Sequence, residues 1–456
     1  MKSLAIVALA AGKGTRMKSD LVKVLHPVAG TPMLSFTLEL ARSLHPERLV
    51  VVVGFQRDLV RQRFTAPDVM FVDQEKQLGT GHAASVAGQA LQDYRGTVLI
   101  LCADVPLLTE GTVRKFLQSH EDCRATLSVL SARLENPRGY GRIVRGEAGQ
   151  LLRIVEDKDL QAGEENIQEV NTGIYCVEGQ FLFSALLSLS DQNAQKEYYL
   201  TDIVEKANSQ GEKAYAFVAE DPMEVMGINT RVDLAKANQV LWQKSAQRHM
   251  LAGVTLMDPQ ATYIDHDVEI GKDTVVYPNC FLLGKTSLGR GCVVEPGCKI
   301  TDARVGNFVT IKASSVITES VLEDRVAVGP FAHLRPETVL REGSRIGSFV
   351  EVKKSVIGKG TKANHLSFIG DATLGEKVNI GAGTITCNFD GRKKHSTIIE
   401  DEVFVGSNTE LVAPIKIGRG AIVGAGSTIT KEVPPETLAV SRARQEHHKK
   451  RSPRKD

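Results

Sequence analysis

Glycines and basic side chains are combined in one short stretch near the N-terminus. Glycine lets the backbone approach an anionic ligand, and successive backbone amides can bind phosphate oxygens. The stretch is not a Walker loop, which ends in Gly-Lys-Ser/Thr, nor a dinucleotide fingerprint, because Met17 stands where that fingerprint has its third glycine. It therefore predicts a phosphate-binding loop of another kind, formed by Leu9-Ala10-Ala11-Gly12-Lys13-Gly14-Thr15-Arg16-Met17 and followed by Lys23.

One carboxylate farther along the chain could also take part in chemistry. Asp104 lies in the segment Cys102-Ala103-Asp104-Val105-Pro106, and carboxylate oxygens can bind a hard cation. Asp104 also has a structural explanation, because it could simply begin a turn before Pro106.

The first half of the chain alternates between apolar runs and helical patterns. Thr31 and Pro32 are typical of an N-cap and the first position of a helix, here ending near Leu44. Alternating strands and helices predict a doubly wound, Rossmann-like α/β sheet, which binds ligands at the carboxyl ends of its strands. Asp104 follows one such end. The predicted strands are Leu4–Leu9, Leu49–Val53, Val69–Val72, Thr97–Cys102, Arg124–Leu130, Gly141–Arg145, Leu151–Glu156 and Val170–Val177.

A six-residue period dominates residues 264–429. Aliphatic residues recur at this interval, with small or β-branched residues two positions earlier, and alternate strand residues face the same side. The period predicts a hexapeptide parallel β-helix of roughly nine coils, and such prisms are commonly left-handed. The first run is Ile264, Ile270, Val276, Leu282, Leu288, Val294 and Ile300, and its inward partners are Thr262, Val268, Thr274, Cys280, Thr286, Cys292 and Cys298.

These patterns divide the chain into four segments. Residues 1–229 are predicted to form the α/β domain and residues 230–250 a connector helix. Residues 251–441 are predicted to form the β-helix, from which residues 387–397 protrude as a loop because they interrupt the period. Residues 442–456 form a basic tail that is predicted to be disordered rather than a binding surface.

Composition excludes several classes of protein. Hydrophobic residues make up 42% and charged residues 24% of 456 positions, which is typical of a globular protein, and no apolar run is long enough to span a membrane. The N-terminus lacks a signal peptide and the seven cysteines include no Cys-x-x-Cys pair, so we expect a cytoplasmic protein without a disulfide framework or zinc site. A net charge of +2 gives no indication of a nucleic-acid partner, and no membrane partner is expected.

The motifs carry a resemblance to known enzymes. The loop at residues 9–17, Lys23 and the segment Gln77-Leu78-Gly79-Thr80-Gly81-His82-Ala83 resemble the signature of sugar-nucleotide pyrophosphorylases. With the hexapeptide region, the chain from Ala5 to about Arg442 resembles the bifunctional bacterial N-acetylglucosamine-1-phosphate uridylyltransferase/glucosamine-1-phosphate N-acetyltransferase family. The resemblance implies a homotrimer whose coil acetylates glucosamine 1-phosphate with acetyl-CoA. It also implies that the α/β domain transfers uridylyl from UTP to the product and releases pyrophosphate.

The resemblance also assigns roles in uridylyl transfer. Asp104 and Asn229 would hold Mg²⁺, and Arg16 and Lys23 would bind the phosphates, because phosphoryl transfer mainly requires charge neutralisation. Without the resemblance, Asn229 could be only the N-cap of the connector helix. The resemblance also implies one set of residues that contacts the nucleotide and another that contacts the N-acetylglucosamine part of the substrate. The nucleotide set is Leu9, Ala10, Ala11, Gly12, Gln74, Gly79 and Thr80, and the sugar set is Gly141, Glu156 and Asn171, with Asn229 also among the substrate contacts.

For acetyl transfer the resemblance makes His365 the base, because only a neutral amine attacks a thioester and an imidazole can accept a proton near neutral pH. Without the resemblance, His365 could be a surface histidine. Arg335 and Lys353 would bind the sugar phosphate, and Phe368 and Asn379 would contact the substrate. The acetyl-CoA site would consist of Ala382, Asn388, Phe389, Ser407, Ala425 and Arg442.

The chain departs from the family at three places. Cys102-Ala103 stands where the family often has an aromatic or hydroxylated residue followed by glycine. Because alanine restricts φ, a backbone contact at Ala103 is in question. Phe368 and Phe389 stand where the family often has tyrosine. The alternatives are a coil that serves only for oligomerisation, a metal hydratase or structural coil, and a nucleic-acid-binding tail. The first would be preferred if acetyl-CoA did not bind, and His365 with Lys353 and Arg335 argues against it. A metal hydratase needs a histidine cluster with zinc spacing, which the isolated histidines of this chain do not show, and a structural coil would have no polar constellation. The third should show a steep salt dependence.

Overall fold

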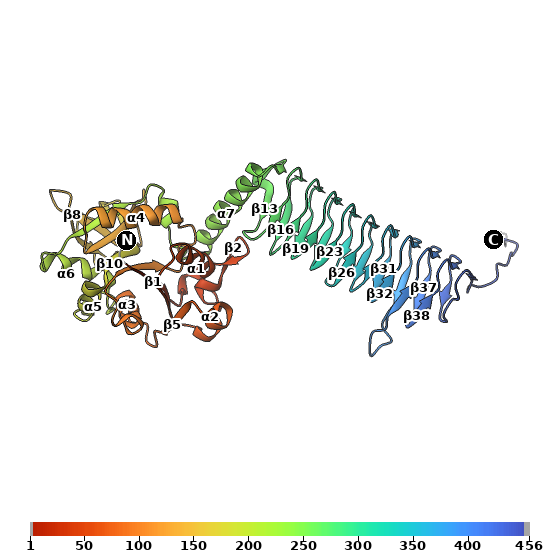
Figure 1. Ribbon diagram of the computed structural model, residues 1–456, viewed down its shortest axis with the longest axis horizontal. Helices are drawn as coiled ribbons and strands as arrows, with labels where there is room; N and C mark the ends of the chain where they lie inside the picture. Colours follow the sequence, from red (N-terminus) through yellow and green to blue (C-terminus); the bar gives the residue numbers. More distant parts are fainter. Residues whose placement is uncertain (1–2, 451–456) are drawn as a thin grey trace, which may run out of the picture. The chain divides into compact units, whose positions relative to one another are not determined.

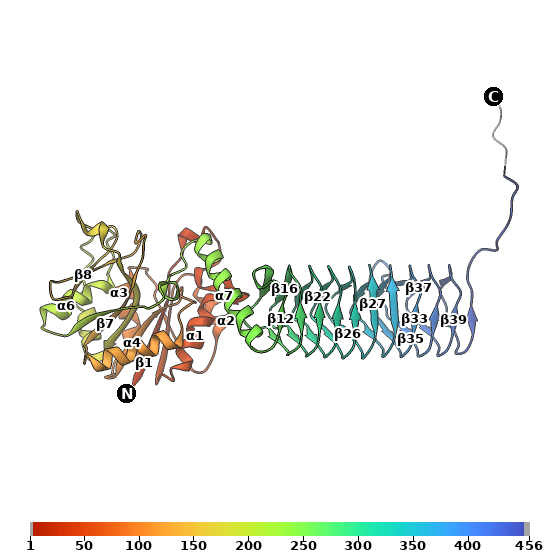
Figure 2. The same cartoon turned by 90° about the horizontal axis from the view of Figure 1, so that it is seen from above.

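A computed structural model describes residues 3–450 of the chain (Figures 1 and 2). The last six residues of the predicted tail lie outside the described residues, as do residues 1 and 2. The chain divides into two compact units between Leu241 and Trp242. Each unit is described by itself.

The first unit is built on one mixed sheet with the strand order β11-β7-β10-β6-β1-β4-β5. Neighbouring strands are parallel except for β10, which runs antiparallel to both β6 and β7. The predicted doubly wound sheet is confirmed, and the antiparallel strand and the β8–β9 hairpin are added to it. The strands are β1 (Leu4–Ala10), β4 (Arg48–Val53), β5 (Val69–Asp73), β6 (Thr97–Cys102), β7 (Leu127–Arg133), β8 (Arg142–Arg145), β9 (Leu151–Val155), β10 (Glu169–Glu178) and β11 (Ala214–Val218).

Helices cover both faces of this sheet, since alternate residues of a buried strand point to opposite faces. On β1, Ala5 and Val7 contribute to one apolar cluster with α3, α5 and α6, and Ile6 and Ala8 to another with α1 and α4. The helices are α1 (Met33–Ser43), α2 (Arg57–Phe64), α3 (Thr80–Gly88), α4 (Glu110–Asp122), α5 (Gly179–Leu186) and α6 (Ile203–Ser209).

The predicted cap of the first helix is wrong. Thr31 and Pro32 form the short strand β3, which pairs with β2 (Pro27–Val28) in a tight hairpin. Helix α1 therefore begins one residue later, at Met33, and its N-cap Pro32 provides no side-chain hydrogen bond. Strand pairing between Thr31 and Val28 determines the conformation at Thr31, and local cap preference does not.

The second unit is a left-handed parallel β-helix whose three walls contain eleven, ten and nine strands in the part that the structure describes, up to residue 450. The walls run from β12 (Thr255–Leu256) to β41 (Leu438–Ala439), from β13 (Thr262–Ile264) to β40 (Thr428–Ile429), and from β14 (Glu269–Ile270) to β38 (Ile415–Ile417). The strands used below are β25 (His333–Leu334), β27 (Arg345–Ser348), β28 (Glu351–Lys353), β30 (Lys362–His365), β31 (Phe368–Gly370), β33 (Asn379–Ile380), β34 (Ile385–Cys387), β35 (Thr397–Ile399), β36 (Phe404–Val405) and β39 (Ile422–Val423).

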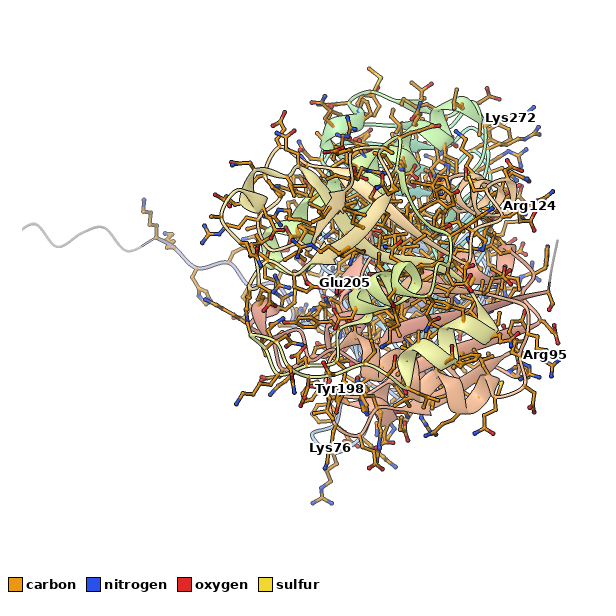
Figure 3. All side chains as sticks on the ribbon, turned by 90° about the vertical axis from the view of Figure 1, so that its left-hand side faces the viewer. Lys76, Arg95, Arg124, Tyr198, Glu205 and Lys272 are labelled. Atoms are coloured by element: carbon orange, nitrogen blue, oxygen red, sulfur yellow. The ribbon has the colours of Figure 1, made fainter. Side chains whose placement is uncertain are left out.

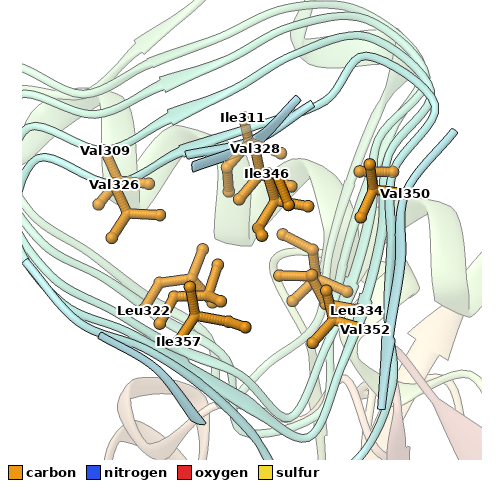
Figure 4. Close-up of a cluster of buried hydrophobic side chains, with 14 of the residues drawn as sticks. Val309, Ile311, Leu322, Val326, Val328, Leu334, Ile346, Val350, Val352 and Ile357 are labelled. Atoms are coloured by element: carbon orange, nitrogen blue, oxygen red, sulfur yellow. The ribbon is translucent and has the colours of Figure 1, made fainter. Parts of the chain in front are cut away.

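The hexapeptide period corresponds to the interior of the coil. Ile264 pairs with Leu282, and Leu282 with Ile300, so one coil places its aliphatic residue on that of the next. Figure 4 shows side chains from all three walls meeting inside the prism, among them Val309, Leu322 and Leu334. The predicted inward small residues, from Thr262 to Cys298, are all buried, which confirms the pattern.

The predicted connector helix is α7 (Arg231–Leu251), one residue later than expected at both ends. In the first unit, Ala237 belongs to a small apolar cluster with Met33 and Leu107. In the second unit, Ala246 belongs to the coil core, and Trp242 packs edge-on against Tyr263 with ring centroids 5.0 Å apart. Within residues 3–450, no helix is both long and apolar enough to cross a membrane.

The predicted protruding loop is confirmed as a hairpin between β34 and β35, visible as the blue excursion in Figure 1. It closes on itself through a bridge between Phe389 and Lys394 and a backbone hydrogen bond from His395 N to Asn388 O of 2.8 Å. The hairpin adds residues to one coil without altering the stacking of β32 (Ala372–Leu374) on β35.

Candidate active sites

A cavity of about 420 Å³ lies at the carboxyl ends of β1 and β6. Parallel strands bring their ends to one edge of a sheet, which is where α/β sheets bind ligands. All seven residues of the predicted nucleotide set line this cavity, together with the predicted phosphate-binding residue Lys23 and the predicted metal ligand Asp104. The seven are Leu9, Ala10, Ala11, Gly12, Gln74, Gly79 and Thr80.

A cationic cluster forms at one side of the cavity. Gly14 has φ +66°, and a Cβ there would lie 2.6 Å from Lys23 Cβ, so glycine permits Lys23 to approach the loop. The Lys23 ammonium forms an ion pair with Asp104 Oδ2 and donates to Asn229 Oδ1 at 3.1 Å. Arg16 donates to the same Asn229 oxygen at 2.9 Å. Four residues from widely separated parts of the chain therefore converge at one point.

The oxygens of Asp104 and Asn229 suit a magnesium ion. Both reach the one ammonium nitrogen of Lys23, so a single cation can contact both. Mg²⁺ takes oxygen ligands and typically binds one or two protein groups together with waters and substrate phosphates. Within residues 3–450, no group of three or more His, Cys, Asp or Glu residues could hold a metal. Any metal here would therefore depend on this pair and on the substrate.

The residue before helix α7 clarifies the role of Asn229. Thr230, not Asn229, caps the helix, because Thr230 Oγ1 accepts from Asp233 N at 3.2 Å and Thr230 O accepts from Leu234 N at 3.0 Å. The carboxamide oxygen of Asn229 is thus directed to Arg16 and Lys23 rather than to the helix. The structural explanation of Asn229 as a cap is wrong.

The predicted sugar-binding residues are also brought together. Asn171 N donates to Gly141 O at 2.8 Å, and a Cβ on Gly141 would lie 3.5 Å from Glu156 Oε2. Thr201 donates to Glu156 Oε1 at 3.3 Å. Burial raises the pKa of Glu156, with the nearby carboxylate of Asp202 adding to the effect. The β8–β9 hairpin and β10 position these residues, which do not line the 420 Å³ cavity.

The cavity and the sugar-binding set are connected through Cys102. Its thiol lines the cavity and donates to Gly173 O at 3.3 Å, next to Asn171 on β10. Burial raises the pKa of Cys102 to about 12, so the thiol remains protonated. Ala103 is fully buried, has no positive φ, and donates its amide to Leu9 O at 3.1 Å. Alanine is therefore accommodated here without backbone strain.

A second chain segment supports the nucleotide loop. Gly79 has φ +103°, and a Cβ there would lie 2.6 Å from Tyr198 O. Tyr198 N donates to Leu78 O at 2.8 Å, and Gln74 donates to Gly79 O at 3.1 Å. Figure 3 shows Tyr198 on the same side of the unit as Lys76, which precedes this loop. The segment around Tyr198 thus fixes Gly79 and Thr80.

In the coil, His365 belongs to a row of predicted residues. Ser348 pairs with His365 between β27 and β30, and the register continues through β33, β36 and β39. This register places His365 and three of the predicted acetyl-CoA residues on successive coils at one corner. The three are Ala382, Ser407 and Ala425. At the end of the row, Arg442 donates to Ala425 O at 2.8 Å.

The predicted phosphate-binding residues lie on the adjacent wall. Lys353 pairs in register with Gly370. On the preceding coil, the guanidinium of Arg335 donates to Glu351 Oε1 at 2.8 Å, and the backbone amide of Arg335 donates to Val352 O. The ammonium of Lys394 lies beside that of Lys353 and, with the guanidinium of Arg335, lowers the pKa of Lys353. Lys394 is a candidate that sequence reasoning missed. The only available signal was the basic run Arg392-Lys393-Lys394 in the protruding loop.

The hairpin is anchored beside this cluster. Asn388 donates to Asp371 Oδ2 at 2.6 Å, and Thr397 N donates to Asp371 O at 3.1 Å, so Asp371 contacts both legs. Phe389 is 60% exposed near the tip. Phe368 is half-buried next to Gly370, where a Cβ would lie 2.7 Å from both Phe368 Cζ and Asn388 Nδ2. Asn379 begins β33 on the coil after His365.

Some residues lining the nucleotide cavity were not predicted to bind the ligand. Gln77 donates to Ala11 O at 3.0 Å and could have been selected from the family motif that contains it. Glu197 and Val24 offered no such signal, because they lie outside any motif, whereas Cys102 was noticed only as a departure from the family pattern. The exposed side chain of His365 has no hydrogen-bond partner among residues 3–450, which leaves it accessible.

Comparison with known proteins gives two family matches. Residues 6–169 match the MobA-like NTP transferase domain, and residues 396–431 match the hexapeptide repeat of succinyl-transferase. The chain is 52% identical to the bifunctional protein GlmU of Pelobacter propionicus, over 98% of this chain and 97% of the relative. The corresponding values for the bifunctional protein GlmU of Geotalea uraniireducens are 51%, 98% and 98%. Halalkalibacterium halodurans GlmU is 46% identical, over 96% of both chains.

The chain belongs to the bifunctional GlmU family. The predicted bifunctional enzyme, a nucleotidyltransferase joined to a hexapeptide-repeat acetyltransferase, is confirmed. The chain acts in UDP-N-acetylglucosamine synthesis, transferring acetyl to glucosamine 1-phosphate and uridylyl to the resulting N-acetylglucosamine 1-phosphate. The alternative of a coil that serves only for oligomerisation is thereby excluded.

Proposed function

We propose that uridylyl transfer takes place in the 420 Å³ cavity, with Arg16 and Lys23 neutralising the phosphates. A phosphate oxygen of N-acetylglucosamine 1-phosphate attacks the α-phosphorus of UTP, and the bond to the β-phosphate breaks to release pyrophosphate. Little covalent chemistry is required of the protein, so positioning and charge supply most of the catalysis. The convergence of both cations at Asn229 Oδ1 is the observation that carries this proposal.

Asp104 and Asn229 would hold Mg²⁺ in this reaction. The ion would supply charge stabilisation on the phosphates, and the two protein oxygens would fix its position relative to the loop. Gln74, Gly79 and Thr80 would bind the nucleotide together with the loop residues 9–12. The sugar would contact Gly141, Glu156 and Asn171, which β8–β9 and β10 bring together.

Acetyl transfer would use His365 as the general base. The amine nitrogen of glucosamine 1-phosphate attacks the thioester carbonyl of acetyl-CoA, and His365 accepts the proton that the nitrogen loses. The carbon–sulfur bond then breaks and the thiolate takes up a proton. The row of Ala382, Ser407 and Ala425 gives acetyl-CoA an extended surface that begins at His365, and Arg442 would contact it beyond the last coil.

Arg335, Lys353 and Lys394 would together bind the sugar phosphate. Mutual repulsion lowers the pKa of Lys353, and a dianionic phosphate would relieve this repulsion. Phe368 and Asn379 would contact the sugar, with Asn388 and Phe389 presented by the hairpin. Phenylalanine at positions 368 and 389 retains ring packing but provides no hydroxyl group.

The protein would act as a homotrimer. Phe331 and Phe349 stack with ring centroids 5.2 Å apart while 51% and 60% exposed, and Leu366 follows at 63% on the next coil. Large apolar side chains exposed side by side are typical of an interaction surface. This ladder borders His365, so a neighbouring subunit that covered it would also enclose the acetyl-transfer site. Sedimentation of a fully active monomer would remove this part of the proposal.

The domains would be catalytically independent. We place the nucleotidyltransferase in residues 1–229, the connector in 230–250, the acetyltransferase in 251–441 and the tail in 442–456. A piece ending near Trp242 retains Asn229 and the first unit, and a piece starting at Ala252 retains the coil. The first piece should make UDP-N-acetylglucosamine and the second should acetylate. Two folded but inactive pieces would contradict independent sites.

The decisive experiment combines one variant for each site. Glucosamine 1-phosphate, acetyl-CoA, UTP and Mg²⁺ are incubated with the protein, each is omitted in turn, and products are identified by mass spectrometry. Asp104→Asn should stop uridylyl transfer and leave acetylation intact, because it removes a metal-ligand charge. His365→Ala should reduce acetylation about a hundredfold or more and leave uridylyl transfer intact. Equal loss of both activities in either folded variant would contradict the proposal.

A further inference from the structure

The first turn of α7 carries a carboxylate that contacts the proposed metal ligand Asn229 through its backbone. Asp233 Oδ2 accepts hydrogen bonds from Asn229 N at 3.1 Å, Thr230 N at 2.8 Å and Thr230 Oγ1 at 2.9 Å. Thr230 Oγ1 in turn accepts from Asp233 N at 3.2 Å. This reciprocal arrangement is a capping box, which satisfies the backbone donors that the start of a helix leaves unpaired.

The capping box also fixes the orientation of Asn229. The Asn229 amide is held by Asp233. The preceding residue, Ile228, is bound to the other proposed metal ligand, because Ile228 N donates to Asp104 O at 2.8 Å. Backbone rotation at Asn229 is thereby restricted on both sides. In this backbone conformation Asn229 Oδ1 reaches the point where Lys23 Nζ and Asp104 Oδ2 also lie.

We propose that Asp233 is a positioning residue of the metal site: through the Asn229 amide it holds the Asn229 carboxamide next to Asp104 for a divalent cation. The inference rests on the proposed function of Asn229. Groups that orient a metal ligand typically contribute 10- to 100-fold to metal affinity. A capping residue with no such role contributes only to helix stability.

The contacts of Asp233 suit it to positioning Asn229 rather than to binding the metal ion itself. Its Oδ2 already accepts three hydrogen bonds from residues 229 and 230, and the side chain is half-buried under the turn. Its negative charge at the start of α7 is also favoured by the partial positive charge of the helix N-terminus. Removing the carboxylate leaves the Asn229 amide without its acceptor and frees the residue to rotate.

The test measures divalent-cation binding directly. Mn²⁺ is titrated into the full-length protein, with and without UTP, and free Mn²⁺ is followed by electron paramagnetic resonance. Asp233→Ala should weaken Mn²⁺ binding about tenfold or more. Asp233→Asn keeps an oxygen acceptor and should restore most of the affinity. Acetylation, which uses the other unit, serves as the control for an intact protein and should not change.

Asp221→Ala is the matched control. Asp221 Oδ1 likewise accepts from a nearby amide, Met223 N at 2.9 Å, at the start of the short helix Pro222–Val225, but it does not contact Asn229. This variant should bind Mn²⁺ as the parent does. If Asp233 acts only through Asn229, then Asp233→Ala should cause no further loss in a protein that already carries Asn229→Ala.

Two outcomes separate this inference from the proposed function beneath it. If Asn229→Ala weakens Mn²⁺ binding while Asp233→Ala binds as the parent does, Asp233 is a helix cap alone and the inference is wrong. If Asn229→Ala itself binds Mn²⁺ normally, the proposed metal ligand fails, and the inference fails with it. If Asp233→Ala does not fold, Asp233→Asn is measured in its place. An Mn²⁺ affinity of Asp233→Asn below one tenth of the parent's would contradict the rescue that the inference expects.

Discussion

The ammonium group of Lys23 forms an ion pair with the carboxylate of Asp104. Both side chains are largely buried, with 13% and 20% of their surface exposed, so the pair is only weakly screened by solvent. Lys23 therefore competes for the same oxygen that a divalent cation would require. An incoming triphosphate offers the ammonium an alternative partner, which couples cation binding to nucleotide binding.

Replacing Lys23 tests this coupling. Lys23→Met should reduce uridylyl transfer strongly, because a phosphate-binding charge is lost. In the absence of nucleotide, however, the variant should bind Mn²⁺ about tenfold more tightly, since two like charges no longer compete for one carboxylate. Mn²⁺ affinity without UTP is the measurement. Unchanged or weaker affinity in a folded variant would mean that Lys23 does not compete with the cation.

Lys394 should contribute to acetylation through substrate binding. Lys394→Met removes one of three cations next to one another, so we expect the KM for glucosamine 1-phosphate to rise about tenfold with a smaller change in kcat. Lys393→Met, in the same exposed hairpin, is the matched control and should have little effect. Steady-state kinetics at constant ionic strength distinguish these outcomes. Equal effects of both substitutions would indicate general attraction rather than a specific contact.

Asp202 should make the stability of the first unit depend on pH. Burial, with a smaller effect from Glu205 and Asp159, raises its pKa from 3.8 to about 6. A carboxyl with a raised pKa in the folded state is most stabilising below its unfolded pKa, near 4, and this contribution is lost as the pH rises through 6. Asp202→Asn should therefore raise the unfolding temperature at pH 8 and have little effect at pH 4.

Differential scanning calorimetry between pH 4 and pH 8 provides this measurement. Asp202 precedes α6 but makes no capping hydrogen bond with its side chain, so the substitution does not remove a cap. The gain in unfolding temperature should develop between about pH 4 and pH 6. A gain of the same size at every pH would contradict the assigned shift.

The core of the coil should be sensitive to cavities. Ile317 is fully buried between Ile300 and Leu334 of the adjoining coils. Ile317→Ala should lower the free energy of unfolding of the second unit by about 2–5 kcal/mol, the usual range for such a truncation. Val316→Ala, which alters the neighbouring, half-buried position, should cost much less. Chemical denaturation followed by Trp242 fluorescence can compare the two.

The sequence by itself determined those features that depend on local spacing. The six-residue period predicted the coil interior because each coil packs only on its neighbours, so the pattern repeats at short range. The loop at residues 9–17 likewise follows directly from a strand, and its contiguous residues 9–15 line the cavity. Local preference was not sufficient at Thr31, where pairing with Val28 overrides the expected cap.

Only the tertiary structure decided which distant residues meet. Lys23, Asp104 and Asn229 converge because the loop after β1, the end of β6 and the start of α7 share one edge of the sheet. Lys394 lies beside Lys353 because the inserted hairpin is anchored at Asp371, next to Gly370, with which Lys353 pairs. His365 and the acetyl-CoA row align because β30, β33, β36 and β39 stack in register despite unequal numbers of intervening residues. Such contacts depend on chain topology and long-range packing, which a local pattern of residues does not encode.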